Sequence, residues 1–121
     1  MTTKFVQEGG VINYANSGSA IAAGSVVVMG HTIGVALTDI AATTGVGAVA
    51  VEGVFTVPKV SAAVFAQGEK LIYDVSASAF DDSLATPATG DITGGAVAFV
   101  AGANAETTCV VKLTPGNATK T

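Results

Sequence analysis

The sequence predicts an all-β protein, built as a small β-barrel or β-sandwich of about seven to nine short antiparallel strands. Short runs rich in Val, Ile and Thr recur along the 121 residues, and clusters that contain Gly, Asn or Ser separate them. Little of the chain has helical character, with at most one short helix near residues 60–67. A chain of this length forms one domain with its own hydrophobic core.

Four strands are expected in the first third of the chain, at residues 4–8, 11–14, 26–29 and 32–37. The first two alternate apolar and polar side chains on either side of a glycine pair, which is typical of edge strands. Only Gly30 and His31 separate the other two. A two-residue connection with Gly in its first place predicts a type II′ hairpin.

The longest candidate strand spans residues 45–59, and we place it at the centre of the domain. It is rich in β-branched residues, contains Gly53 and is closed by Pro58. This pattern favours a core strand that is bent or bulged at Gly53.

Three further strands are expected at residues 70–75, 95–101 and 107–113, with a short edge strand near 79–80. In residues 60–67 alanines replace the β-branched runs, and Gly68 stands where a helix commonly ends, which predicts the short helix. The Pro-Gly-Asn sequence at 115 disfavours another strand. We therefore expect an amino-terminal arm or edge strand at 1–9, a β domain at 10–114 and a flexible tail at 115–121.

The composition excludes several classes of function. Charged residues make up 12% of the chain, against roughly a quarter in ordinary soluble domains. The net charge is −4 and the five lysines are scattered, so no basic patch for nucleic acid is expected. No apolar run approaches the roughly 20 residues of a membrane helix. A single cysteine, Cys109, excludes an internal disulfide and a multi-cysteine metal site.

No group of residues predicts catalysis. His31, the only histidine, is expected to be a solvated turn residue, and Cys109 alternates with aliphatic residues in a way that predicts a core position. Gly45-Val46-Gly47 lacks the rest of a phosphate-binding loop. Asp81 and Asp82 stand in a polar loop without the other ligands of a calcium site. We therefore expect no enzyme, no cofactor and no metal.

Glu52 is the only charged residue in the interior of the apolar stretch at 45–59, so its environment needs an explanation. A carboxylate inside an apolar strand is costly unless it is paired or reaches water. Three alternatives remain: it faces solvent, it forms an ion pair with Lys59 or Lys70, or it pairs across a subunit interface.

Several motifs together resemble the DUF2190 family of capsid cement, or head decoration, proteins of tailed bacteriophages. The segments that carry the resemblance are Phe5-Val6-Gln7-Glu8-Gly9, Ile12-Asn13-Tyr14, Gly34-Val35-Ala36-Leu37-Thr38-Asp39, Glu52-Gly53-Val54-Phe55-Thr56-Val57-Pro58-Lys59 and Gln67-Gly68-Glu69-Lys70-Leu71-Ile72-Tyr73-Asp74. They cover most of the chain in order. Gly10 departs from the family, which often has an acidic residue there, and the carboxyl-terminal tail is longer than is typical.

The resemblance implies a small β-rich protein that binds and stabilises the outside of an assembled phage head. Its partner would be the major capsid protein, and the chain would act as a homotrimer near threefold sites. It would be found on the outer capsid surface of a virion assembled in the host cytoplasm, with no nucleic acid, membrane or cofactor involved. Binding only the assembled shell would stabilise that state by mass action.

Two hypotheses concern the contacts. The arm that docks on the shell or on a neighbouring copy would consist of Lys4, Phe5, Val6, Gln7 and Glu8. The trimer contact would lie on the apolar surface of residues 45–59 and their hairpin partner.

Two other functions remain as alternatives to the hypothesis of a capsid cement protein. One is a different structural β domain of the virion, associated with the tail or a fibre. The other is a carbohydrate-binding β-sandwich, which the absence of Trp and the presence of only Tyr14 and Tyr73 disfavour.

Overall fold

The computed structural model describes residues 9–121, and in this range the chain is all-β with no helix. Ten strands follow one another: β1 (Val11–Ala15), β2 (Val26–Met29), β3 (Thr32–Ala36), β4 (Val46–Ala50), β5 (Val54–Pro58), β6 (Lys70–Asp74), β7 (Ala79–Asp81), β8 (Ile92–Ala98), β9 (Thr108–Leu113) and β10 (Thr119–Lys120). The predicted fold class is confirmed. The short helix expected near 60–67 is absent, because that segment forms turns around an isolated bridge between Phe65 and Gly102.

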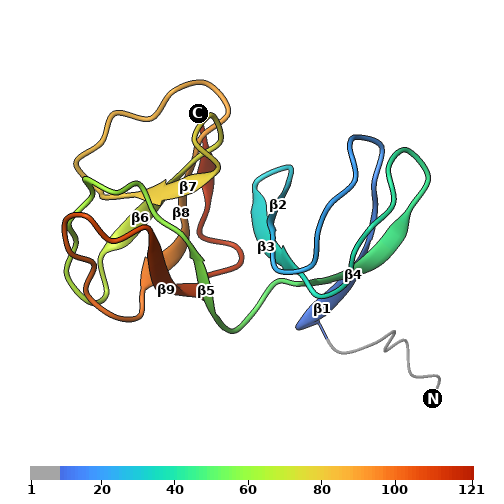
Figure 1. Ribbon diagram of the computed structural model, residues 1–121, viewed down its shortest axis with the longest axis horizontal. Coiled ribbons are helices and arrows are strands. Elements are labelled where there is room, and N and C mark those ends of the chain that lie inside the picture. The colour runs from blue at the N-terminus through green and yellow to red at the C-terminus, as the bar shows by residue number, and fades with distance from the viewer. Residues whose placement is uncertain (1–8) are drawn as a thin grey trace, which may run out of the picture.

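The strands form two antiparallel sheets that lie side by side as two lobes (Figure 1). The amino-terminal lobe is a four-stranded sheet in the order β1-β4-β3-β2. The second lobe, which we call the barrel, has the order β5-β9-β8-β6-β7, with β10 paired to β8. Its sheet curls until its two ends meet, since a parallel bridge joins Lys59 to Phe80 and the Val60 N–H donates to the Phe80 carbonyl at 2.9 Å.

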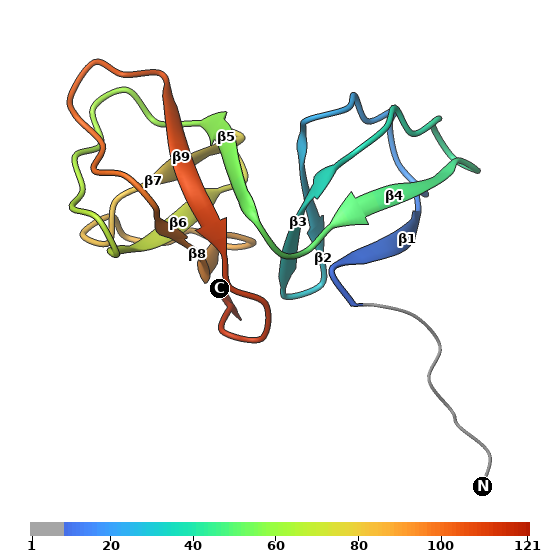
Figure 2. The ribbon, with the colours of Figure 1, turned by 90° about the horizontal axis from the view of Figure 1, so that it is seen from below.

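The single long strand expected at residues 45–59 does not exist. Its two halves are β4 and β5, which belong to different sheets, and the chain crosses from one lobe to the other between them (Figure 2). Gly53 has a φ of 122°, a backbone conformation that other residues rarely adopt, so a continuous pleated strand does not run through it and β5 begins at the next residue. The glycine that suggested a bulge therefore marks the boundary between the lobes.

The hairpin expected at Gly30 and His31 is confirmed. Met29 pairs with Thr32, which leaves two residues in the loop. Gly30 has a φ of 61°, whereas His31 does not adopt a positive φ. This combination is the one that a type II′ turn requires.

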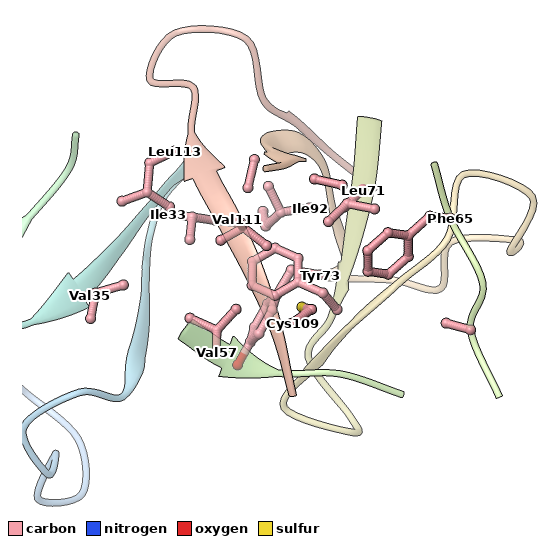
Figure 3. Close-up of a cluster of buried hydrophobic side chains, with 14 residues drawn as sticks. Ile33, Val35, Val57, Phe65, Leu71, Tyr73, Ile92, Cys109, Val111 and Leu113 are labelled. Atoms are coloured by element: carbon pink, nitrogen blue, oxygen red, sulfur yellow. The ribbon is translucent and has the colours of Figure 1, made fainter. Parts of the chain in front are cut away.

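One hydrophobic core joins the two lobes. Ile33 and Val35 of β3 belong to the same buried cluster as Val111 and Leu113 of β9 (Figure 3). A smaller cluster on the opposite face of the amino-terminal sheet consists of Val27, Ala36, Ile40 and Val49. The amino-terminal sheet is thus buried on both faces at its β2–β3 end.

The chain forms a further strand after Pro115, so the expectation that none would follow is wrong. β9 pairs only with the last residues of β8, Ala96 to Ala98. β10 pairs with the first residues of β8, Ile92 and Thr93. The main chain of Thr121 then exchanges hydrogen bonds with Gly90 and Asp91. Within residues 9–121 the chain forms no helix of the length and apolarity needed to cross a membrane.

Candidate interaction site

Lys59, one of the residues considered for an ion pair, is buried directly after β5 with only 4% of its surface exposed. Its Nζ donates hydrogen bonds to the carbonyl oxygens of Val60, Ser61 and Glu106, at 2.9, 3.1 and 3.2 Å. An ammonium group has three donors, and all three are used here. This cage of carbonyl oxygens compensates the cost of burying the charge.

The structure does not bring Lys59 together with Glu52 and Lys70. Glu52 is exposed in the crossing between the lobes, and its Oε2 lies beside Gly10. Lys70 is exposed at the start of β6, where its aliphatic part lies against Gly94. Because the donors of Lys59 all meet carbonyl oxygens, Lys59 is not the partner of Glu52 within the chain. A pairing of Glu52 across a subunit interface stays a prediction.

The Lys59 cage holds two loops together at the end of the barrel. Glu106 belongs to the β8–β9 connection and Ser61 to the β5–β6 connection, and the Ala105 N–H donates to the Ser61 carbonyl at 2.7 Å. Further along, Phe65 and Gly102 exchange both main-chain hydrogen bonds, and the buried Phe65 ring lies over Gly102. The two connections therefore form a short ribbon at the end of the barrel.

The outer side of this ribbon is apolar. Val64, Phe99 and Val100, which we call the barrel tip, are each about half exposed. Both views place the two connections at the end of the barrel away from the amino-terminal lobe (Figures 1 and 2).

A second apolar surface lies on the amino-terminal lobe. In the register of its strands, Val46 pairs with Ala15, Ala48 pairs with Asn13, and the Leu37 N–H donates to the Ala48 carbonyl. Residues two apart in a strand share a face, so these five residues lie on one side of the sheet. We call this surface the open face. Val46 is 65% exposed and Leu37 is 46% exposed.

Cys109 lies in the core of the barrel, as predicted. It is buried and its Sγ is 4.0 Å from the carbonyl oxygen of Pro58. Burial raises the pKa of the thiol to about 11, although the positive charge of Lys59 opposes that shift. A thiol in this state is a poor nucleophile near neutral pH.

The other candidates for chemistry are solvated or serve the fold. His31 is exposed at the tip of the β2–β3 hairpin, beside a pocket of about 310 Å³ that it lines with Thr32 and Lys120. Asp81 ends β7 and Asp82 follows it, and their carboxylates accept hydrogen bonds from the main-chain N–H groups of Asp82 and Leu84, respectively. No group of three or more His, Cys, Asp or Glu side chains suited to a metal occurs in the described part of the chain.

Two buried polar residues, which the sequence did not single out, organise loops. Asn16 donates to the carbonyls of Ser19 and Ala41, and Asp91 accepts from the main-chain N–H groups of Val75 and Ala88. Both are of residue types that are common in turns, and no sequence signal distinguishes a buried one from an exposed one. The proposed arm, residues 4–8, lies outside the described residues.

The chain matches a family described as phage cement protein over residues 6–113. It belongs to the phage cement protein family. A search among curated proteins gives no match. The resemblance seen in the sequence motifs is thereby confirmed at the level of the family.

Membership of the cement family supports a structural, capsid-associated role in a phage particle. In this context, the open face and the barrel tip are two alternative contact surfaces of the cement chain, since both expose apolar side chains.

Proposed function

We propose that this cement-family chain binds the outer surface of an assembled bacteriophage head, through its major capsid protein, and stabilises the head against disruption. The observation that carries this proposal is the family match, which extends over almost the whole described chain.

Stabilisation follows from binding alone. A protein that binds the assembled shell and not its dissociated subunits shifts the equilibrium toward the shell by RT ln(1 + [L]/Kd), which is about 2.7 kcal/mol per site when the free concentration is 100 times Kd. The two lobes share one core, so the chain would act as a stiff link between the shell subunits it touches.

A homotrimer would strengthen the attachment. Three linked copies engage the shell together, so modest contacts by each copy add up to a stable attachment. The single surface on residues 45–59 that was expected to form the trimer is divided between the lobes, because β4 and β5 lie in different sheets. Sedimentation velocity over a range of concentrations tests the trimer, and a strictly monomeric protein would remove it without removing the head-binding role.

The amino-terminal segment of Lys4, Phe5, Val6, Gln7 and Glu8 is the proposed docking arm. Its alternating pattern is that of a strand which adds to the edge of another sheet. We expect deletion of residues 1–9 to abolish head binding while the far-ultraviolet circular dichroism of the β domain is retained. Head binding by the truncated protein with wild-type affinity would show that the arm is not required.

The head-binding role is tested with heads prepared with and without this protein. Electron microscopy is expected to show added density on the outer surface of the complete heads only. The complete heads should also release their DNA at a higher temperature and resist osmotic shock better. Equal resistance of both preparations, with no outer density, would refute the proposal.

A further inference from the structure

The two lobes differ in the charge they carry. In residues 9–53 the charged residues are Asp39 and Glu52. Residues 54–121 carry ten, namely Lys59, Glu69, Lys70, Asp74, Asp81, Asp82, Asp91, Glu106, Lys112 and Lys120. Charged residues are depleted from the buried centre of protein–protein interfaces, because their desolvation is costly. In its charge content, the amino-terminal lobe therefore resembles the centre of a contact region more closely than the barrel does.

The open face lies on the same side of the amino-terminal sheet as the contact with the barrel. Ile33 and Val35 of β3 are buried on that side in the shared core, and Leu37 continues their alternation. Val46 stands at the start of β4, at the end of the lobe away from the barrel (Figure 2). On this side of the sheet, the barrel thus buries Ile33 and Val35 and leaves Leu37 and Val46 exposed.

From the charge distribution and the open face together, we infer that the amino-terminal lobe is the shell-facing end of the molecule, that its open face docks on an uncharged surface of the capsid protein, and that the barrel projects into solvent. This inference rests on the proposed head-binding function. Beyond that function, the inference specifies which surface of the chain contacts the shell.

The size of the open face favours the shell over a second copy of the chain as its occupant. Three neighbouring strands at a spacing of about 4.8 Å, over three or four residues each, cover roughly 200 Å². A stable dimer buries about 800 Å² on each partner. A contact this small holds when several act together, as they do on a repeating shell.

Protection of single cysteines on decorated heads tests the orientation. Val46→Cys on the open face and Val64→Cys on the barrel tip form a matched pair, since both valines are more than half exposed. The native Cys109 gives little background, because it is buried. We expect maleimide to label both variants equally in the free protein. On heads, labelling of Val46→Cys should slow at least tenfold, and that of Val64→Cys should stay unchanged.

The outcomes separate the inference from the proposed function. Failure of the wild-type chain to decorate heads would refute the function itself. Decoration with undiminished labelling of Val46→Cys, or with protection of Val64→Cys alone, would leave the function standing and overturn the orientation. Protection of Val46→Cys already in the free protein would assign the open face to contact with a second copy and would also overturn it.

Charge substitutions give a second measurement. Burial of an unpaired carboxylate costs more than 1.4 kcal/mol, so Val46→Asp should weaken head binding at least tenfold, whereas Val64→Asp should bind as wild type. Thermal unfolding checks that both variants are folded. Leu37 lies directly after β3 on the open face. If Val46→Asp is unfolded, head binding is measured with Leu37→Asp instead. Wild-type binding by a folded open-face variant would contradict the inference.

Discussion

The side-chain ammonium of Lys59 donates a hydrogen bond to the carbonyl oxygen of Glu106, 3.2 Å away and 47 residues further along the chain. Of the three hydrogen bonds that hold this buried lysine, it joins the residues that are farthest apart in the sequence. Through it, a charge that would be costly in isolation ties the β5–β6 connection to the β8–β9 connection. This contact therefore joins the two connections that carry the barrel tip.

Replacement of Lys59 by methionine should therefore destabilise the protein. Methionine fills a similar volume, but it leaves the Glu106 carbonyl without a donor, while the Val60 and Ser61 carbonyls keep only the N–H groups of Ala63 and Ala105. We expect the free energy of unfolding to fall by about 1 to 3 kcal/mol. Urea unfolding followed by circular dichroism measures the change. Lys112→Met, on an exposed position of β9, is the matched control and should change stability by less than about 0.5 kcal/mol. Equal effects of the two variants would contradict the role assigned to the cage.

The contact between the lobes depends on a glycine in β8. A Cβ atom at Gly95 would lie 2.7 Å from Cδ1 of Ile33, a separation that real side chains do not adopt. We expect Gly95→Ala to push Ile33 out of the shared core and to lower the free energy of unfolding by about 1 to 3 kcal/mol. Gly9→Ala, where a Cβ meets no atom within 4 Å, should have no comparable effect. Urea unfolding followed by circular dichroism measures the change. If Gly95→Ala and the wild type unfold at the same urea concentration, the lobes are not packed as described.

Glu69 links stability to pH. The pKa of its carboxyl lies below the usual value of 4.5, chiefly because the Ser83 N–H donates to it, with further donation from the Ala66 N–H and the Ser83 hydroxyl. A lowered folded pKa means that the stabilisation is complete above the unfolded value of about 4.5 and is lost as the pH falls through the folded value. Glu69→Gln should thus be less stable than wild type at pH 7, and the difference should shrink toward pH 3. Ser83→Ala should change stability in the same direction by less, and a difference independent of pH would refute the account.

The carboxyl-terminal residues contribute to the barrel. Deletion of residues 119–121 removes β10 from the edge of β8 and breaks the hydrogen bonds between Thr121 and the Gly90–Asp91 main chain. We expect a loss of about 1 to 2 kcal/mol in urea unfolding, since net contributions per hydrogen bond are about 1 kcal/mol and part of the gain is offset by ordering. Wild-type stability after the deletion would support the flexible tail expected from the sequence.

Much of the fold was predictable because its causes are local. The β2–β3 hairpin follows from a glycine at the first of two loop positions, and the core place of Cys109 follows from alternation with aliphatic neighbours. The short strands at β6 and β9 follow from runs of β-branched residues between turn signals. These features depend on residues within a few positions of one another.

Two of the incorrect predictions, the single strand at 45–59 and the helix near 60–67, have the same physical origin. Gly53 interrupts an apolar run, and a bulge and a crossing between sheets require the same freedom of the backbone, so the sequence pattern does not separate them. Residues 60–67 have a composition suited to a helix, but Phe65 gains more by packing into the barrel beside Gly102. In both places, distant partners decide between two local structures of similar stability.

For the candidate contact surfaces, too, some properties follow from the sequence and others depend on the tertiary structure. The low charge of residues 9–53 and the cement family motifs can be read from the chain itself, because composition and motif do not depend on folding. The burial of Lys59 and the exposure of Val46 cannot, since each depends on which loops or lobes cover the residue. By itself the sequence determined an all-β protein of the phage cement family, and it located several of the short strands, among them β2, β3, β6 and β9. Only the tertiary structure decided which sheet each strand joins and which face is left uncovered, because those outcomes are set by packing between residues far apart in the chain.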